Sequence, residues 1–178
     1  MSRRKWEQLS TEVVLCTPYY DIRRDRYVLP AGGEGVYTYV DIDGSAMVVP
    51  LLDSGELVLV RQHRYLMGRD SLEFPAGGIK RGAGARQTAA QELREEAGYR
   101  ADGLEPLGAF SPYNGASNEM CQVFLATGLR PAPADPDATE ELQPVRLSPD
   151  QLRRRVASGE VWDGMTIASL ALFELRGP

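Results

Sequence analysis

The sequence predicts a fold of the α+β class or a mixed α/β sandwich, and three observations support this prediction. Short β-branched and aromatic runs predominate in the first half of the chain, whereas segments rich in strong helix formers appear late. No internal repeat and no linker divides the 178 residues, which suit one domain, since single domains usually contain roughly 100–200 residues. Strands followed by helices within one domain are typical of the α+β class.

The strands are predicted from runs of β-branched and aromatic residues that end at turn or charge signals. In the first part of the chain, the charged segment Asp21–Asp25 and the turn Pro30–Gly33 separate three such runs. Further on, Asp53-Ser54-Gly55 predicts a tight hairpin between two apolar runs. The predicted strands are Val13–Cys16, Tyr27–Leu29, Val36–Val40, Ala46–Leu52, Leu57–Gln62, 102–110, 119–127 and Val145–Leu147.

The helices are predicted in the second half of the chain. Residues 86–97, RQTAAQELREEA, are nearly all strong helix formers, and Gly98 is a natural C-terminal cap. Residues 149–158 follow Ser148, a favourable N-cap, and residues 164–176 form the last predicted helix. The glycine-rich segment that precedes the first helix is predicted to be a loop.

Composition and charge exclude several function classes. Lys and Arg number 20 and Asp and Glu 25, so the net charge of −5 argues against a broad cationic surface for nucleic acid or a membrane. The longest apolar stretches, such as Ala46–Leu52 and Ile167–Phe173, are too short to span a bilayer. The basic start MSRRKWEQLS is followed by no apolar region, so we expect no secretory signal and a cytoplasmic protein.

The thiol and imidazole groups do not predict a zinc site. Cys16, Cys121 and His63 are far apart in sequence, whereas a zinc site needs about four clustered ligands. We expect both cysteines to lie in the core and His63 to be a packed or surface residue rather than a base. Any hydrolytic chemistry would then depend on carboxylates and on a metal ion that prefers oxygen ligands.

The helix that ends at Gly98 carries an acidic cluster in its last turn. Its apolar stripe consists of Ala85, Ala89, Leu93 and Ala97, with Ala90 beside it. Glu92 and Glu96 share one edge of this stripe, and Glu95 lies further round. Like charges four residues apart cost about 0.2–0.5 kcal/mol, and carboxylates at a helix C-terminus oppose its dipole by about 0.3–1 kcal/mol each. A divalent cation would reverse the sign of both penalties.

A solvated acidic surface is the alternative to a metal site for these glutamates. The preceding segment 75–85, PAGGIKRGAGA, favours a metal site, because its four glycines allow a ligand to approach the backbone closely. Two or three carboxylates with a nearby backbone carbonyl form a reasonable shell for Mg²⁺ or Mn²⁺.

Residues 77–99, GGIKRGAGARQTAAQELREEAGY, resemble the Nudix box, whose pattern is G-x5-E-x7-R-E-U-x-E-E-x-G-U. The first glycine of the pattern falls on Gly77, and the other matches are Glu92, Leu93, Glu95, Glu96, Gly98 and, loosely, Tyr99. Two positions depart, since the first Glu of the family falls on Ala83 and its Arg on Gln91. In the family these two residues brace the loop against the helix, and losing both together leaves no orphaned charge.

The resemblance extends over most of residues 35–176, where the chain is similar to the ADP-ribose pyrophosphatase branch of the family. The further matching segments are Val60–Tyr65, Glu73–Gly77, Ser111–Gly115 with Glu119, and Trp162–Ala168. The resemblance implies an α/β/α sandwich with a mixed β-sheet core and C-terminal helices. It also implies a hydrolase domain over residues 45–178 that follows an N-terminal β extension over residues 1–44.

The activity that the resemblance implies is Mg²⁺-dependent hydrolysis of the pyrophosphate bond in ADP-ribose or a related nucleoside diphosphate sugar. The products would be a nucleoside monophosphate and a sugar phosphate, and Mn²⁺ could replace Mg²⁺. Carried over to this sequence, Glu92 and Glu96 bind the metal, and Glu95 is a ligand or supports one. Ala76 contributes its backbone carbonyl. The metal would polarise the phosphoryl oxygens and acidify the attacking water.

The general base of this branch is an acid on a mobile loop late in the chain. That loop corresponds here to Asp135–Glu141, within and after the Pro/Asp-rich segment 130–140. Glu140 and Glu141 are the candidates, with Asp137 behind them. A solvated acidic loop is the alternative, and a closing lid would suit the catalytic role.

Several charged residues are candidates for substrate binding. Arg61 and Arg64 could grip phosphates with bidentate donors, but they project to opposite faces of a strand, so we favour Arg64. Glu73 is expected to bind the substrate or brace the site, or else to pair with a nearby Arg. Glu119 matches a Glu of the branch motif P-G-x-S-x-E, although Asn114 replaces its Pro, and could hold the terminal sugar or a metal-bound water.

The resemblance also implies a homodimer, because N-terminal strands in this branch exchange between subunits and help to close the nucleotide pocket. Trp6, Tyr19, Tyr20 and Tyr27 could then stack on the base, although we favour a plain hydrophobic dimer contact for each.

Two alternatives stay open. The departures at Ala83 and Gln91 also fit a non-catalytic nucleotide-sugar binding module or regulator. A Nudix hydrolase for GDP-mannose, FAD or a dinucleotide would differ only in the leaving group, and no spacing identifies the residues that bind base and sugar.

Overall fold

The computed structural model describes residues 6–135 and 141–176. The chain forms two compact units. Unit 1 comprises Met1–Gly44 and Tyr113–Glu119, and unit 2 comprises Ser45–Pro112 and Met120–Pro178.

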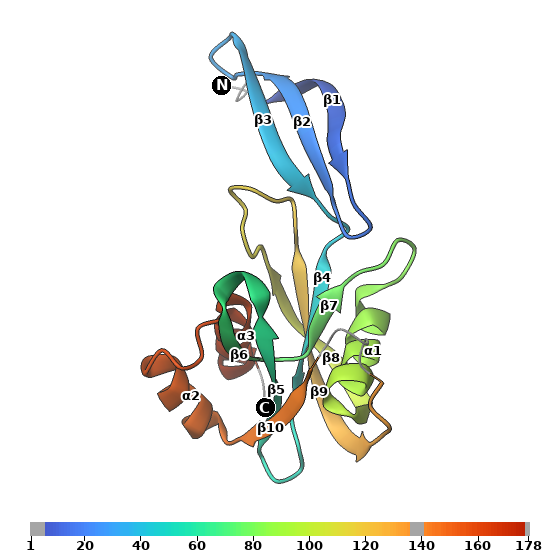
Figure 1. The fold of residues 1–178 in the computed structure, drawn as a ribbon, viewed down its shortest axis with the longest axis vertical. Coiled ribbons are helices and arrows are strands. Elements are labelled where there is room, and N and C mark those ends of the chain that lie inside the picture. The colour runs from blue at the N-terminus through green and yellow to red at the C-terminus, as the bar shows by residue number, and fades with distance from the viewer. Residues whose placement is uncertain (1–5, 136–140, 177–178) are drawn as a thin grey trace. The chain divides into compact units, whose positions relative to one another are not determined.

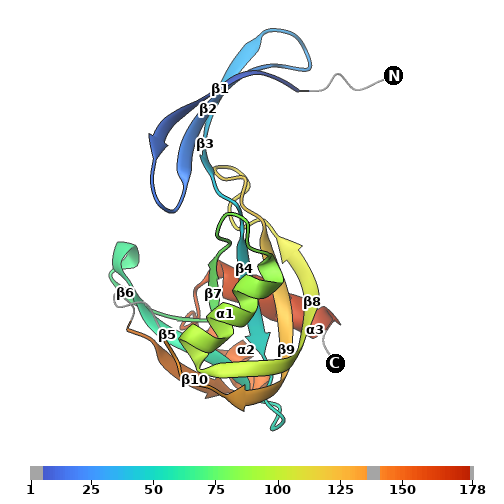
Figure 2. The ribbon, with the colours of Figure 1, turned by 90° about the vertical axis from the view of Figure 1, so that its right-hand side faces the viewer.

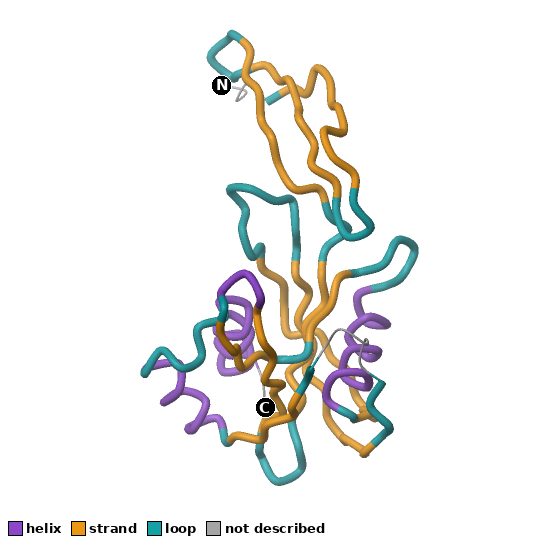
Figure 3. The backbone as a smooth tube through the Cα atoms, viewed as in Figure 1, coloured by secondary structure: helices purple, strands orange, loops and turns teal. Residues whose placement is uncertain are grey.

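The elements of the described residues follow one another as Figures 1 and 3 show. In chain order they are β1 (Glu7–Cys16), β2 (Asp21–Val28), β3 (Glu34–Asp41), β4 (Ser45–Pro50), β5 (Leu57–Arg64), the 3₁₀ turn η1 (Tyr65–Met67), β6 (Arg69–Glu73), β7 (Ala76–Gly78), α1 (Ala85–Ala97), β8 (Tyr99–Phe110), β9 (Cys121–Pro131), β10 (Gln143–Leu147), α2 (Pro149–Ala157) and α3 (Gly164–Arg176).

Unit 1 contains a three-stranded antiparallel sheet in the order β1-β2-β3. The prediction that Asp21–Asp25 separates two strands is wrong, because these residues lie in β2. Their charges are balanced across strands, where Arg23 pairs with Asp41 at 2.5 Å and Arg24 pairs with Glu12 at 3.0 Å. A strand whose faces are exposed or half-buried can therefore carry a run of charges.

All residues of β1 are exposed, and Cys16 is among them. The prediction that Cys16 lies in the core is therefore wrong, whereas Cys121 in unit 2 is buried as predicted. The reason is that the strands of unit 1 consist only of exposed and half-buried residues, so their sheet has no core that Cys16 could enter.

Unit 2 contains two sheets, in the orders β10-β5-β6 and β7-β4-β9-β8. Strand β4 runs parallel to β9, whereas β7 and β8 pair with their neighbours in antiparallel fashion, so the second sheet is mixed. Figure 2 shows α1 on one face of these strands, with α2 and α3 behind them. This arrangement confirms the predicted α+β class with a mixed sheet between helical layers.

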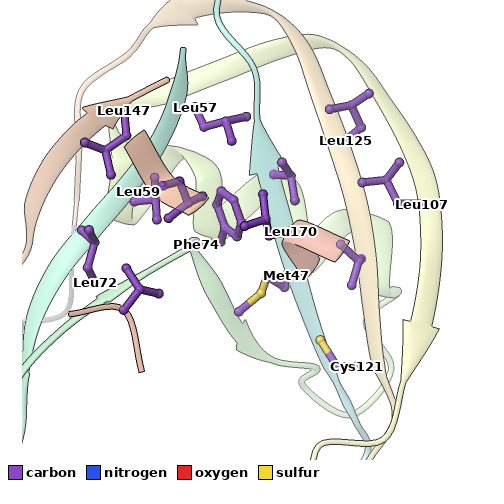
Figure 4. Close-up of a cluster of buried hydrophobic side chains, with 14 residues drawn as sticks. Met47, Leu57, Leu59, Leu72, Phe74, Leu107, Cys121, Leu125, Leu147 and Leu170 are labelled. Atoms are coloured by element: carbon purple, nitrogen blue, oxygen red, sulfur yellow. The ribbon is translucent and has the colours of Figure 1, made fainter. Parts of the chain in front are cut away.

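The alternating direction of the side chains along β5 explains why helices pack on both faces of the strands of unit 2. Leu57 and Leu59 enter a cluster with Leu152 of α2 and Leu170 of α3. Figure 4 shows Leu57, Leu59 and Leu170 of this cluster around Phe74. The next residues, Val58 and Val60, enter a second cluster with side chains of α1. Because successive side chains of a strand point to opposite faces, one strand supplies both cores.

Helix α1 lies within one residue of its predicted bounds. Ala89, Leu93 and Ala97 are buried against the strands, whereas Ala90, which the helical projection sets beside them, is exposed. Gly98 ends the helix with φ of 71°, and its N–H donates to the carbonyls of the last turn. Glycine is suited to this left-handed cap because it has no Cβ.

Strands β6 and β7 are absent from the prediction, and the segment 75–85 is not a loop throughout. Residues Ala76–Gly78 pair with β4, where Met47 faces Ala76 and Ser45 faces Gly78. Glycine-rich residues carry no strand signal of their own, so this strand forms only because β4 offers backbone partners. Within the part of the chain that the structure describes, no helix is long and apolar enough to cross a membrane.

Candidate active site

The segment Glu73-Phe74-Pro75-Ala76 connects β6 to β7, and each of its residues is bound by a different element of unit 2. The partners are Arg64 of β5 for Glu73, Thr166 of α3 for Phe74, Val48 of β4 for Pro75 and Glu96 of α1 for Ala76. Contacts with four other elements therefore fix the position of this segment.

Glu96 directs its carboxylate from the last turn of α1 to the start of β7. Its Oε2 accepts a hydrogen bond of 3.0 Å from the backbone N–H of Ala76, and the residue is only 6% exposed. Burial of a carboxylate is costly unless it is paired or bonded. The helix therefore places an acid where a surface helix would end in a basic residue.

Glu92 lies against the next residue of the same strand. A methyl group built on Gly77 would lie 2.2 Å from Oε1 of Glu92 and 2.5 Å from its Cδ. Only a residue without a side chain allows the carboxylate to come this close to the backbone. The structure thus brings Glu92, Glu96 and Ala76 together at β7.

Glu95 is held differently from the other two glutamates. Its carboxylate accepts hydrogen bonds from Gln91 Nε2 at 3.0 Å and from Arg94 at 2.6 Å. Gln91 occupies the position of the family's Arg, and here it contacts an acid of its own helix. Glu95 is therefore fixed between two side chains of α1.

The oxygen ligands gathered at β7 suit a hard divalent cation. Two carboxylates and a backbone carbonyl are all oxygen ligands, which Mg²⁺ prefers, and water completes such a shell. The close approach of Glu92 to Gly77 shows that the backbone makes room for a carboxylate there. Among residues 6–135 and 141–176, no three His, Cys, Asp or Glu side chains are grouped so as to hold a metal ion.

Arg64 and Glu73 form a bidentate ion pair across β5 and β6. Arg64 Nε donates to Glu73 Oε1 at 2.8 Å, Nη2 donates to Oε2, and Gln62 Nε2 adds a bond of 3.3 Å. The Glu73 side chain is 4% exposed and that of Arg64 is 48% exposed. The hydrogen bond to Glu73 raises the pKa of Arg64, to which the charges of Glu73, Asp163 and Glu96 add, while burial opposes the shift.

This ion pair is the alternative that the sequence left open for Glu73. Binding of a phosphate by Arg64 stays a prediction. Arg61 lies three residues earlier on β5, is half-buried, and is not among the residues that line the pocket described next.

A pocket of about 770 Å³ opens beside the ion pair. Its lining consists of Gln62, His63, Arg64, Tyr65, Leu66, Met67, Glu73, Glu141, Trp162 and Asp163. Of the candidate bases, the exposed Glu141 lies at this pocket, whereas Glu140 and Asp137 lie outside the described residues. His63 is exposed, as predicted, and its Nδ1 lies 3.1 Å from Asp70 Oδ1.

The remaining candidates belong to unit 1. Glu119 is half-buried, and its backbone N–H donates to Ser117 Oγ at 3.0 Å. The rings of Trp6 and Tyr27 contact each other in a tilted arrangement, with centroids 5.3 Å apart. Tyr19 and Tyr20 are 82% and 42% exposed, so both could meet a ligand or a second subunit.

Sequence reasoning missed the roles of Gln62, Asp163 and Thr166. Gln62 could have been found by alternation, because it lies two residues before Arg64 on the same face of β5. Asp163 and Thr166 lie in the matched segment Trp162–Ala168, but nothing in the sequence shows which part of the chain they contact.

Comparison with known protein sequences gives three findings. The model of the NUDIX domain family matches residues 42–166. The chain is 32% identical over 174 residues to an ADP-ribose pyrophosphatase of Mycobacterium tuberculosis, covering 96% of this chain and 84% of that protein. It is 25% identical over 170 residues to a methanol dehydrogenase activator of Bacillus methanolicus, covering 94% and 92%.

A solved structure agrees with the fold. The crystal structure of an ADP compounds hydrolase matches with a TM-score of 0.86 at 22% identity, covering 98% of this chain and 95% of that one. At this identity the likeness supports the fold alone.

Proposed function

Because this chain belongs to the NUDIX domain family, we propose that it hydrolyses the pyrophosphate bond of ADP-ribose or a related nucleoside diphosphate sugar. The products are a nucleoside monophosphate and a sugar phosphate. The observation that carries the proposal is the meeting of Glu92 and Glu96 at β7. The substrate class follows the name of the Mycobacterium tuberculosis relative.

In this proposal Glu92, Glu96 and the carbonyl of Ala76 hold Mg²⁺, for which Mn²⁺ could substitute. Glu95 supports this set from its bonds to Gln91 and Arg94. When bound, the metal polarises the phosphoryl oxygens and lowers the pKa of the attacking water. The carboxylates balance the charge of the ion, which removes their mutual repulsion in the last turn of α1.

The proton of the attacking water goes to a carboxylate of the late acidic segment. We assign this role to Glu141 or Glu140, and the position of Glu141 at the pocket supports it. Arg64 uses Nε and Nη2 for Glu73, so we assign its Nη1 donors to a substrate phosphate, with Arg61 as a second candidate. Glu119 remains the candidate contact for the terminal sugar.

We further propose that the protein is a homodimer formed through unit 1. The argument is the exposed apolar surface of β1, where Leu9, Val13, Val14 and Leu15 are 46–54% exposed. Apolar patches of this kind mark interfaces more often than free surface. Trp6, Tyr19, Tyr20 and Tyr27 are candidates for that interface or for stacking on the base.

The test is to incubate the protein with ADP-ribose and MgCl₂ and to quantify AMP. The variant Glu96→Gln keeps an oxygen that can accept from Ala76 N–H but loses the charge. We expect its rate to fall by about a hundredfold or more, since several kcal/mol of transition-state stabilisation depend on the metal. Glu105→Gln, on an exposed position of β8, is the matched control. Chelation with EDTA is expected to abolish turnover and added Mg²⁺ to restore it.

The proposal is wrong if the wild type releases no AMP at any divalent-metal concentration, or if Glu96→Gln turns over as fast as the wild type. A panel of GDP-mannose, FAD and dinucleotides, read out by the nucleoside monophosphate formed, distinguishes substrates within the family.

A second candidate is a non-catalytic nucleotide-sugar binding module or regulator. The name of the Bacillus methanolicus relative, an activator of another enzyme, favours keeping it. Calorimetry separates the two, because binding of ADP-ribose without turnover at every metal concentration would support the regulator.

A further inference from the structure

One of the hydrogen bonds that hold the backbone next to Ala76 comes from the amide of Phe74. Between Glu73 and Ala76 the chain contains only Phe74 and Pro75, and proline has no N–H. The amide of Phe74 is therefore the only backbone donor within this connection. It donates to Thr166 Oγ1 at 3.1 Å, across 92 residues of sequence.

Thr166 is itself fixed by the start of α3. Its own N–H donates to Asp163 Oδ2 at 2.7 Å, and the carbonyl of Asp163 accepts from Ile167 N at 3.1 Å. This is the N-cap arrangement, which sets the first turn of a helix. Thr166 is fully buried, so its hydroxyl cannot exchange its partner for water.

The bond adds a polar contact to the apolar packing between α3 and the Glu73–Ala76 connection. Phe74 is 1% exposed in the cluster that includes Leu170 of α3. On one side of Phe74 lies Glu73 with its ion pair, and two residues further on lies Ala76, which contacts Glu96. Loss of the acceptor would leave a buried N–H without a partner, which costs more than loss of a bond in water.

We propose that Thr166, oriented by Asp163, is a positioning residue for the metal site. Its hydroxyl holds the amide of Phe74 and thereby sets the carbonyl of Ala76 relative to the carboxylates of Glu92 and Glu96. The inference rests on the proposed function, because it takes Ala76, Glu92 and Glu96 as the metal ligands.

The test compares three variants of α3. Thr166→Val keeps the shape of the side chain but removes the acceptor, and Thr166→Ser keeps the acceptor. Ser169→Ala is the control, because Ser169 is a fully buried hydroxyl on the same helix that contacts Met47 Sδ at 2.9 Å instead of the Glu73–Ala76 connection.

Two measurements are made on each folded variant. Mn²⁺ binding without substrate is measured by electron paramagnetic resonance, and AMP release is measured against Mg²⁺ concentration. Thr166→Val is expected to raise both the Mn²⁺ dissociation constant and the half-activating Mg²⁺ concentration about tenfold, the effect usual for residues that orient ligands. Thr166→Ser and Ser169→Ala are expected to stay within about twofold of the wild type.

Amide hydrogen exchange of the wild type provides a reading that does not depend on the folding of any variant. Phe74 N–H is expected to exchange as slowly as the core amides of β4. Rapid exchange at Phe74 would overturn the inference, as would unchanged Mn²⁺ binding by Thr166→Val or an equal loss in Thr166→Ser. A wild type that binds Mn²⁺ but releases no AMP would refute the proposed hydrolase function and leave this positioning role standing.

Discussion

Gly77 and Gly78 are neighbours in β7, but a methyl group would meet different surroundings at each. At Gly77 it would lie 2.2 Å from the carboxylate oxygen of Glu92, whereas at Gly78 nothing lies within 4 Å. Neither residue has a positive φ, so neither backbone conformation requires glycine. Alanine substitutions at these two glycines therefore test whether Glu92 needs the space beside Gly77.

Gly77→Ala is expected to displace the Glu92 carboxylate and to weaken Mn²⁺ binding about tenfold, with little change in thermal stability, because the flexible end of Glu92 can move. Titration of Mn²⁺ measures the first quantity and thermal unfolding the second. Gly78→Ala is the control and should behave as the wild type. Equal binding by both variants would contradict the placement of Glu92 at the metal.

At the scale of single residues, the sequence predicted what depends on local geometry. Glu92 and Glu96 share a helix face because residues four apart always do. The partner of Arg64 could not be predicted, because its pairing with Glu73 depends on the register of β5 and β6, in which Val60 faces Glu73. From the sequence, an ion pair with an Arg was only one of the roles open to Glu73.

Strands β5 and β6 are joined by an ion pair whose two members differ in burial. The carboxylate of Glu73 is 4% exposed, while half of the Arg64 side chain reaches water. Removing Arg64 and removing Glu73 should therefore lower the stability of the folded protein by different amounts. A stranded guanidinium can be hydrated where it stands, whereas a stranded carboxylate cannot.

Arg64→Ala is expected to lower the free energy of unfolding by about 3 kcal/mol, because it leaves a buried charge uncompensated. Glu73→Gln is expected to cost about 1 kcal/mol, the net value of an ordinary hydrogen bond. Urea denaturation at pH 7.5 measures both. Equal losses would mean that Glu73 is hydrated in the folded protein, contrary to its burial.

An element was predicted accurately where the residues that determine it lie within the element itself. Helix α1 was predicted within one residue because its composition and the cap at Gly98 are local. Strand β7 was missed because it exists only through pairing with β4, which lies some thirty residues earlier in the chain. The charges of β2 suggested a break because their partners lie on β1 and β3, and a single segment does not reveal them.

On the scale of the whole molecule, unit 1 gathers segments that are distant in sequence. Tyr37 donates to the carbonyl of Gly115 at 2.7 Å, and Val40 N donates to that of Ala116 at 2.8 Å. No local signal in Tyr113–Glu119 shows that it joins the N-terminal strands. Only the family motif around Glu119 drew attention to this segment.

The proposed homodimer predicts a specific response to charge on β1. Val13 and Leu15 are 52% and 54% exposed, so replacing both with Asp should spare the fold but oppose an apolar interface. Light scattering during gel filtration should give twice the 19.6 kDa chain mass for the wild type and a single chain mass for Val13→Asp with Leu15→Asp. Asp53→Lys, on an exposed turn of unit 2, should remain dimeric. A monomeric wild type would exclude the dimer.

The four-way attachment of Glu73–Ala76 has a consequence for the order of events during synthesis. The ribosome releases Glu92 and Glu96 well before α3 emerges, yet Phe74 has no partner for its amide until Thr166 is present. By the proposed positioning role of Thr166, a chain that lacks α3 would not assemble the proposed metal site in full. The proposed affinity for the ion would then depend on the presence of α3, and a bound cation would in turn stabilise the folded state by mass action.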